Sequence, residues 1–490
     1  DLGLALVAFS LPFFLLPKPL VGRTISMTEA SLVLVALAWV LRRTLILLDE
    51  SEYRASRGFR WLDWVSWVLA GVAALAAVVT LIPAANTGPL ATADWPVLTL
   101  MLLPLAGVLA AAAQAEERVS KPATQGVRGL DLAVAVLVGL ALAATLAADS
   151  FGVSLQEFHV VVWNGAAFYA FIQLTRSLDP QAQTPRTNAE SLAWYVVDAF
   201  MLGTTLMALY ATYQFFFTDQ AITVEGVHRA IGVYGSPNNL ALLLDRAVPI
   251  LIAVVAFSSV VSSPQRENKT TRQRRILYGL ALIPTLTALV LTFSRGALLL
   301  GLPAAVLFMG IVRGGWALWI AVGILVTAGI ALLPMFGTDR FRSILDINTG
   351  TGFFRLRLWQ SAWAMLRDFP WLGVGLDNFL YQYRTRYILP DAWQEPNLSH
   401  PHNILLDFGT RLGIGGIAVL LWSQIAYWRV AWRLYHRLPK GAIRALILGL
   451  MASMIATLAH GLVDNSFFLV DLGFIYMLTL GVVARLAVVS

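Results

Sequence analysis

Two histidines, His400 and His402, stand directly before a long apolar run in the segment EPNLSHPHNILLDFGTRLGIGGIAVLLW (395–422). A histidine can take a proton from a hydroxyl group at neutral pH, so the pair could supply a general base. It could equally be solvated at a helix end, because polar side chains at a protein surface often have no further role. Residues two apart do not share one face of a helix, so we expect at most one of them to point into a cavity framed by that helix.

A second polar segment, VEGVHRAIGVYGSPNNLALLLDRAVP (224–249), places Arg229 shortly before a turn and a helix start. Ser236 followed by proline is typical of a helix N-terminus. The amide of Asn238 would then lie near the positive end of the helix dipole, where an anion is favoured. A capped helix beside a solvated arginine is the alternative, since such caps are common.

A third segment, LTFSRGALL (291–299), carries Arg295 between two apolar runs. A charge at that depth of a membrane is costly, so such an arginine usually reaches the interface or serves a function. A guanidinium binds phosphate oxygens through paired N–H groups and keeps its charge. Arg295 and Arg229 together would therefore suit a diphosphate.

His460 and Asp464 occur in LAHGLVDNSFF (458–468). Residues four apart share a helix face, so the two could hydrogen-bond each other, or Asp464 could orient one of the outer histidines. The sequence has no cysteine and no outer group of Asp, Glu and His with the spacing of a cation site. We therefore expect no metal and no cofactor.

The elements that must position these residues are membrane helices. Of the 490 residues, 58% are apolar and only 13% are charged, which is far from the composition of a soluble domain. Apolar stretches long enough to cross a bilayer recur along the whole chain, so residues 1–490 are expected to form one all-α transmembrane domain. We expect about fourteen spans: 2–16, 27–41, 61–83, 95–114, 130–149, 158–174, 191–217, 239–261, 276–295, 296–312, 316–336, 402–428, 443–463 and 468–489.

The charges of the connecting segments predict which side each faces. Segments 42–60, 115–129, 262–275 and 429–444 are rich in Lys and Arg, which is typical of cytoplasmic loops. The helices then thread through the membrane with both termini cytoplasmic. Segment 218–238, the junction at Arg295 and the long segment 337–401 fall on the external side. The net charge of +7 is explained by this topology, and no basic stripe with interleaved aromatic residues suggests nucleic-acid binding.

Segment 337–401 is the one hydrophilic insertion large enough to form a structured element. Within it, residues 354–369 have apolar side chains at helical spacing and Arg355 and Arg357 on the other face, which predicts a helix lying at the membrane interface. Arginines are unusually frequent on this external side. An anionic ligand presented at the outer leaflet would use them.

The strings HRAIGVYGSPNNLA, TFSRGALL, RLRLWQSAWAMLRDFPWLGVGLDNF and HPHNILLDFGTRLGIGG, in this order, resemble the O-antigen ligase and O-antigen polymerase family of bacterial membrane glycosyltransferases. The resemblance covers roughly residues 225–465. It implies an architecture similar to that of the lipid-dependent GT-C glycosyltransferases, in the bacterial inner membrane, with the active site facing the periplasm. It also implies transfer of a glycan from an undecaprenyl-diphosphate carrier to a lipid A core or to another lipid-linked glycan, without a metal and with inversion.

The resemblance assigns roles residue by residue. Arg229 and Arg295 match the arginines that bind the diphosphate, and His402 matches the base that activates the acceptor hydroxyl. Asn238 is the better match to the family's asparagine, because it directly follows the proline. His400, Arg355 and Arg357, with His460 and Asp464, are further candidates for the substrate cavity.

A transporter, such as a flippase for a glycan linked to the same lipid diphosphate, is the alternative function. About fourteen spans and external arginines would suit it as well. A flippase needs charge-compensating residues along a path through the membrane, whereas the candidate residues here gather on one predicted side.

Overall fold

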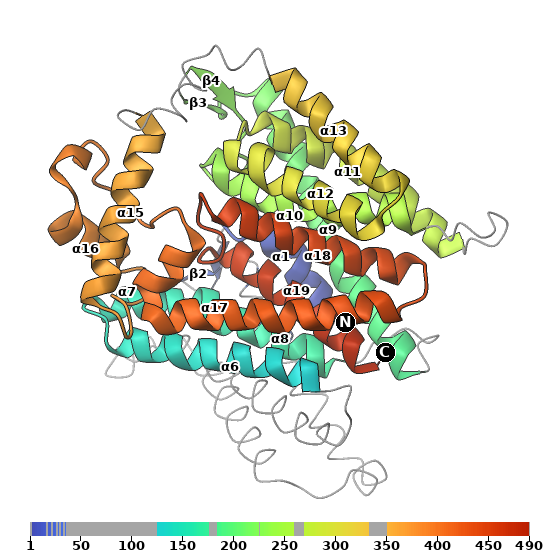
Figure 1. The fold of residues 1–490 in the computed structure, drawn as a ribbon, viewed down its shortest axis with the longest axis horizontal. Helices are drawn as coiled ribbons and strands as arrows, with labels where there is room; N and C mark the ends of the chain where they lie inside the picture. The colour runs from blue at the N-terminus through green and yellow to red at the C-terminus, as the bar shows by residue number, and fades with distance from the viewer. Residues whose placement is uncertain are drawn as a thin grey trace, which may run out of the picture.

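The computed structural model describes residues 2–15, 18–20, 23–25, 28, 31–32, 35, 125–175, 184–224, 226–258, 269–332 and 350–489. These residues form a helical bundle, so the predicted mostly helical architecture is confirmed (Figure 1). The strands among them form two short antiparallel hairpins, β1 (Lys18–Leu20) with β2 (Arg23–Ile25), and β3 (Ile222–Val224) with β4 (Val227–Arg229).

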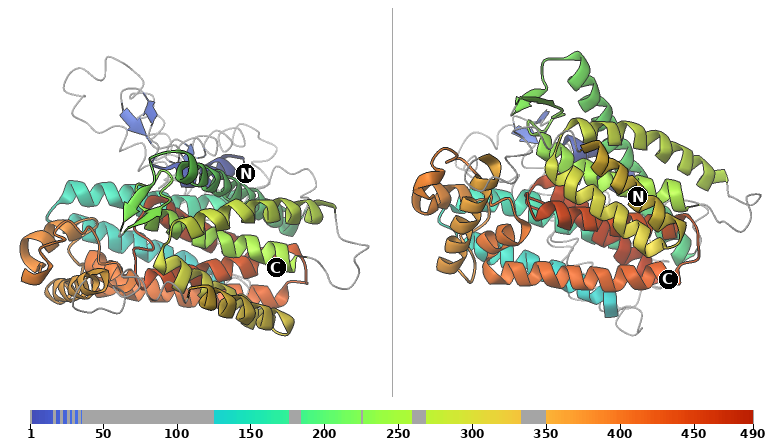
Figure 2. Two further views of the ribbon diagram at one scale, coloured as in Figure 1. Left: turned by 90° about the horizontal axis from the view of Figure 1, so that it is seen from above. Right: turned by 45° about the horizontal axis from the view of Figure 1, so that its top comes forward.

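The longer helices run side by side, and the described part of the insertion, residues 350–401, lies at one end of them (Figures 1 and 2). In chain order, the helical elements up to residue 332 are α1 (Leu2–Ser10), η1 (Leu11–Phe13), α6 (Gln125–Leu146), α7 (Phe151–Glu157), η6 (Phe158–Trp163), α8 (Asn164–Leu174), α9 (Pro185–Phe217), α10 (Pro237–Phe257), α11 (Lys269–Leu291), η8 (Gly296–Gly301), α12 (Leu302–Arg313) and α13 (Trp316–Leu332). From residue 350 they are α15 (Gly350–Asp368), α16 (Phe379–Gln382), η10 (Tyr383–Tyr387), η11 (Pro390–Ala392), α17 (Ile404–Arg437), α18 (Ala442–Gly461) and α19 (Val470–Val489).

Within the described ranges, eight helical segments are long and apolar enough to cross a membrane, and residues 2–13 and 316–330 form shorter apolar helices. The eight are α6, α9, α10, α11, η8 with α12, α17, α18 and α19. The predicted spans 61–83 and 95–114, and most of 27–41, lie outside the described residues. The chain is a multi-pass membrane protein, and the total of about fourteen spans stays a prediction.

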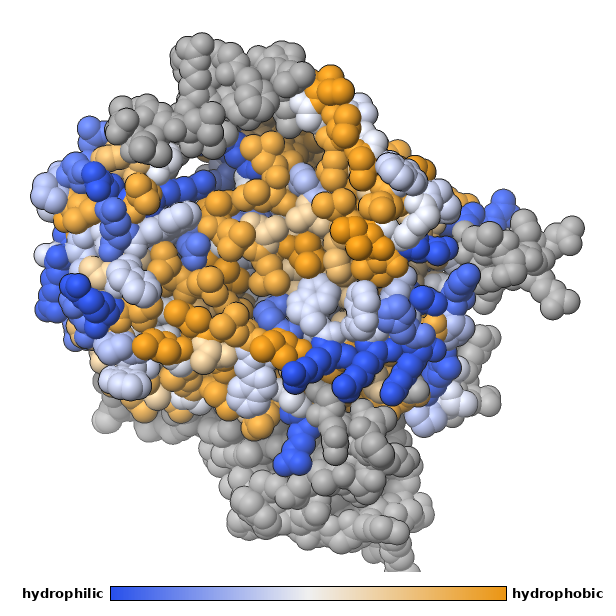
Figure 3. All heavy atoms as spheres, viewed as in Figure 1, coloured by the Kyte–Doolittle hydropathy of each residue, from blue (hydrophilic) through white to orange (hydrophobic). Residues whose placement is uncertain are grey.

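The interior of the bundle is built from α10, α18 and α19, whose residues are mostly buried. Helix α10 packs against α18 and α11, and α19 packs against α8. The outer helices instead expose aliphatic side chains, such as Leu277, Leu280 and Ile283 of α11. Apolar residues cover the middle of the face in Figure 3, and hydrophilic residues gather toward its ends. An exposed apolar surface of this kind is what a lipid-facing bundle requires.

The described part of the insertion starts with α15, which forms where the sequence predicts a helix over residues 354–369. This helix runs across the direction of α17, as a helix lying at the interface would (Figure 1). Of the predicted insertion, residues 337–349, which include Arg340 and Arg342, lie outside the described residues.

The insertion is joined to α17 at a kink. Gly413 has a φ of 69°, which interrupts the helix, and a Cβ atom there would lie 2.4 Å from the carbonyl carbon of Trp371. Val374 N donates to Thr410 O over 2.7 Å, and Ile414 N donates to Pro370 O over 2.7 Å. The insertion thus satisfies backbone groups that the kink leaves without helical partners. This contact fixes one end of the insertion relative to α17.

Candidate active site

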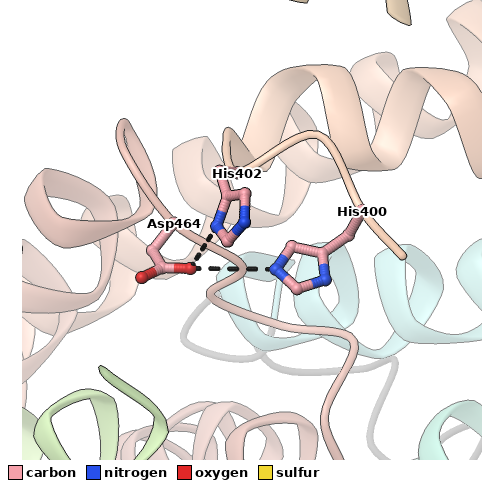
Figure 4. A group of neighbouring side chains, drawn as sticks. All are labelled: His400, His402 and Asp464. Atoms are coloured by element: carbon pink, nitrogen blue, oxygen red, sulfur yellow. Dashed lines mark hydrogen bonds and ion pairs between the residues drawn. The ribbon is translucent and has the colours of Figure 1, made fainter. Parts of the chain in front are cut away.

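His402 and Asp464 form the centre of the site (Figure 4). His402 Nδ1 lies 2.8 Å from Asp464 Oδ1. An ionised carboxylate only accepts hydrogen bonds, so His402 donates through Nδ1–H and the lone pair of the neutral ring is on Nε2. No described residue hydrogen-bonds to Nε2, and 22% of the His402 side chain is exposed. The ring is therefore oriented by Asp464 and can accept a proton at Nε2.

His400 lies beside this pair. Its Nε2 is 3.8 Å from Asp464 Oδ1, its ring centroid is 4.3 Å from that of His402, and its Nδ1 lies 3.0 Å from Ser399 Oγ. Both histidines thus approach Asp464, which differs from the expectation that at most one would point into a cavity framed by the helix. That expectation assumed helical periodicity, but both residues precede α17, and His402 has a left-handed φ of 48° that turns its ring toward Asp464.

The segment that carries the histidines is held at two points. Asn403 caps α17 by accepting from Leu405 N and Leu406 N, and its Nδ2 donates to Leu462 O over 3.0 Å. On the other side, the indole N–H of Trp359 in α15 donates to Pro401 O over 3.0 Å. Trp359 was not among the predicted site residues, although it belongs to the apolar face of residues 354–369.

The charges at the site are set by this close packing. Burial by itself would raise the pKa of Asp464, but His402 and the contact with His400 hold that pKa well below its ordinary value. Asn465 N also donates to Asp464 Oδ1 over 2.9 Å. Partial burial and the neighbouring His402 lower the pKa of His400. At neutral pH, Asp464 is therefore an anion and His400 is neutral.

The partner of His460 is Asp245 and not Asp464. His460 Nδ1 lies 2.6 Å from Asp245 Oδ2 in α10, and both side chains are fully buried. Of the two alternatives left open for His460 and Asp464, a hydrogen bond between them is not the one found, because α18 ends at Gly461 and Asp464 is no longer on its face. The other alternative, in which Asp464 orients an outer histidine, is the arrangement found.

Arg229 and Asn238 lie together, as expected. Arg229, the last residue of β4, donates through Nε to Thr292 O over 2.6 Å and through a terminal nitrogen to Asn238 Oδ1 over 2.9 Å. Asn238 stands in the first turn of α10, after the Ser236 N-cap and Pro237. The first hydrogen bond also ties Arg229 to the end of α11, a few residues before Arg295.

Arg295 directly precedes the π-helical segment η8. A Cβ atom at Gly296 would lie 2.5 Å from His460 Nε2 and 3.2 Å from Val463 Cγ2. The backbone after Arg295 therefore packs against His460 and against Val463, the neighbour of Asp464. A continuous set of contacts leads from Arg229 through Thr292 and the Arg295 junction to the segment that carries Asp464.

Arg355 and Arg357 of α15 face different parts of the protein. Arg357 forms an ion pair with Asp391 of 2.7 Å and lies over the ring of Phe353, so it stabilises the insertion itself. Arg355 precedes Trp359 by four residues, which places it on the helix face that contacts Pro401. Arg355 thus remains on the side of the histidines and Arg357 does not.

Residues 280–421 match the family model described as O-antigen ligase. The chain carries an O-antigen ligase domain. The predicted resemblance is confirmed over residues 280–421, and the match supports a membrane glycosyltransferase activity that uses lipid-linked glycans. No match to a curated protein was found.

The matched part of the O-antigen ligase domain contains Arg295, Arg355, Arg357, His400 and His402. Arg229, Asn238, His460 and Asp464 lie outside residues 280–421, but the contacts above bring Arg229 and Asp464 against it. The site of this O-antigen ligase domain is therefore completed by the segments before and after the matched region.

A buried ionic cluster supports the domain beneath the histidines. Arg411 of α17 pairs with Asp407 over 2.7 Å and with Glu157 of α7, and its guanidinium lies 4.7 Å from the ring centroid of Phe468. Removing one member of a buried ion pair costs about 3–5 kcal/mol, because the other charge is left without a partner. The cluster thus fixes α7, α17 and the segment before α19 relative to one another. Sequence reasoning missed it, although Asp407 and Arg411 have the i, i+4 spacing of a helical pair.

The structure brings together three side chains that could bind a metal ion. His400, His402 and Asp464 each offer a ligand atom, and these atoms all lie within 4.8 Å of one another. The prediction that no outer group of Asp, Glu and His has the spacing of a cation site was therefore wrong, because Asp464 is far from the histidines along the chain but close to them in space. The expectation that catalysis needs no metal stays a prediction.

Proposed function

We propose that this protein transfers a glycan from an undecaprenyl-diphosphate carrier to the hydroxyl of a lipid-linked acceptor glycan or a lipid A core, at the periplasmic face of the bacterial inner membrane. Both termini are then cytoplasmic, and membrane lipids surround the bundle. The observation that carries this proposal is the His402–Asp464 pair, in which Nε2 is left to accept a proton.

In this reaction His402 Nε2 takes the proton of the acceptor hydroxyl while the acceptor oxygen attacks the anomeric carbon of the glycan. A new carbon–oxygen bond forms as the bond between the anomeric carbon and the diphosphate breaks, which inverts the configuration. The diphosphate leaves with the electron pair. Asp464 stabilises the imidazolium that forms, as an oriented carboxylate does for a histidine base.

Arg229 and Arg295 would neutralise the leaving diphosphate. Guanidinium groups bind phosphate oxygens through paired N–H groups and hold their charge at all working pH values, so no metal is needed for this role. The contacts that join Arg229 and the Arg295 junction to the Asp464 segment support their use at one site.

The test uses purified protein with one carrier-linked glycan and mass spectrometry of the products. Longer carrier-linked chains identify a polymerase, and a product that requires an added lipid acceptor identifies a ligase. A transporter would move the lipid and form no new glycosidic bond, which would contradict the proposal.

The arginines are tested by donor binding. Arg229→Ala and Arg295→Ala should each weaken binding of undecaprenyl diphosphate by about tenfold or more, because a hydrogen bond to a charged group contributes about 1.5–3 kcal/mol. Binding is measured by microscale thermophoresis, with the ion-paired Arg357→Ala as a matched control. Unchanged affinity in both variants would exclude the arginine clamp.

A further inference from the structure

His400, His402 and Asp464 have the donor types and the spacing of a zinc site. His402 Nδ1 and His400 Nε2 lie 2.8 Å and 3.8 Å from the same Asp464 oxygen, and all three ligand atoms fall within 4.8 Å (Figure 4). Zn²⁺ binds imidazole nitrogen and carboxylate oxygen at about 2.0–2.2 Å, so two tetrahedral ligand atoms stand about 3.3 Å apart. The observed separations bracket this value, and small rotations of the rings would reach it.

The surroundings also fit a cation. A histidine that binds zinc usually holds its other ring nitrogen in a hydrogen bond, and His400 Nδ1 lies 3.0 Å from Ser399 Oγ. The carboxylate of Asp407 acts electrostatically on His400, and His400 acts on the carboxylate of Asp377, so negative charge surrounds the histidines. Arg411 is paired with Asp407 and Glu157. Among the described residues, the side chains in ion-pair distance of Asp464 are the two histidines.

We propose that His400, His402 and Asp464 bind Zn²⁺, with water as a fourth ligand, and that the bound ion inhibits glycan transfer. The second half of this proposal rests on the proposed function. The reason for inhibition is the tautomer of His402. When Nδ1 of a neutral imidazole binds a metal, the single ring proton is on Nε2. Nε2 then donates a hydrogen bond and cannot accept the proton of the acceptor hydroxyl.

The binding test is independent of catalysis. The purified full chain is treated with a chelator, freed of it, and titrated with Zn²⁺ in an isothermal calorimeter. We expect one site per chain, and at least a tenfold loss of affinity in His400→Ala and in Asp464→Asn, since even residues that only support a ligand contribute about tenfold to metal affinity. His436→Ala, an exposed histidine at the far end of α17, is the matched control. Mg²⁺ should not compete, because it prefers oxygen ligands.

A spectroscopic measurement keeps the test valid if a variant does not fold. Co²⁺ added to the wild-type chain should give the intense visible absorption of a four-coordinate site, and Zn²⁺ should displace it stoichiometrically. If wild-type protein binds neither ion at a single site, or if His400→Ala retains full affinity with a normal melting curve, the metal site is excluded.

The inhibition test compares each protein with its own metal-free rate. Zn²⁺ should inhibit the wild type and EDTA should restore its rate, whereas His400→Ala should lose sensitivity to Zn²⁺ by the same factor as its loss of binding. Binding without inhibition, or activation by Zn²⁺, would overturn the inhibitory role. A protein that binds Zn²⁺ but makes no glycosidic bond with any donor would instead contradict the proposed function and leave the metal site standing.

Discussion

Two histidine–aspartate pairs lie toward the end of the bundle that carries the insertion: an inner, buried pair and an outer, partly exposed pair. They differ in access rather than in bonding. His402 meets Asp464 over 2.8 Å, and His460 meets Asp245 over 2.6 Å, in each case through Nδ1. In both, Nε2 has no hydrogen-bond partner among the described residues. The His402 side chain is 22% exposed, whereas that of His460 is fully buried, and Gly296 packs directly against its Nε2.

Access distinguishes the two oriented imidazoles, because a general base must reach the hydroxyl that it deprotonates. The buried pair joins α10 to α18 and gives the backbone after Arg295 a surface to pack on. The outer pair stands on segments outside the spans, where a hydroxyl can reach it. We therefore assign chemistry to His402 and structure to His460.

The largest expected effect is on the outer pair. His402→Ala should lower the transfer rate by about a hundredfold or more, because a positioned general base contributes about that factor. Donor binding should be nearly unchanged, since the arginines remain. The measurement is a radiolabelled glycan transfer assay with purified protein, and near-normal turnover would remove His402 from its assigned role.

Asp464→Asn should have the next largest effect on rate. Asparagine keeps the shape and the acceptor oxygen but removes the charge that stabilises the imidazolium. A hydrogen bond to a charged group contributes about 1.5–3 kcal/mol, which corresponds to about ten- to a hundredfold in rate. The loss should fall on kcat and leave KM largely unchanged. A change confined to KM would mean that Asp464 contacts substrate rather than His402.

Substitution in the buried His460–Asp245 pair should mainly lower the stability of the fold. His460→Ala leaves Asp245 buried without its partner, which costs about 1–3 kcal/mol of unfolding free energy. The rate of the protein that remains folded should fall far less than in His402→Ala. Thermal unfolding monitored in detergent, together with the transfer assay, separates the two, and a hundredfold loss of rate at normal stability would contradict the structural role.

The smallest effect is expected at Arg357. Its ion pair with Asp391 is partly exposed, and such pairs contribute about 0.2–1 kcal/mol. Arg357→Ala should therefore lower the melting temperature slightly and leave transfer unchanged. A large loss of activity would contradict this role and support the original prediction that Arg357 lies in the substrate cavity.

The sequence predicted most of what depends on local pattern. Hydropathy located the described spans, and the break at Arg295 was found where α11 ends and η8 begins. Family resemblance indicated Arg229, Asn238 and Arg295, of which the first two lie in hydrogen-bond contact.

The pairings of the buried groups were not predictable from spacing. His460 and Asp464 are four apart, yet the helix ends between them, so one turns inward to α10 and the other outward to His402. Likewise, the approach of Trp359 to Pro401 depends on how α15 crosses α17. Such contacts are set by tertiary packing between distant segments, which periodicity does not encode.

The contact between the insertion and the kink of α17 limits how the insertion could be exchanged in an engineered protein. Residues 370–374 and 410–414 exchange backbone hydrogen bonds, and Gly413 has no room for a side chain. An insertion transferred without residues 410–414 would therefore lose these backbone hydrogen bonds. Chimeras designed to change the acceptor should carry both segments as one unit, and their crossover points belong outside residues 350–414.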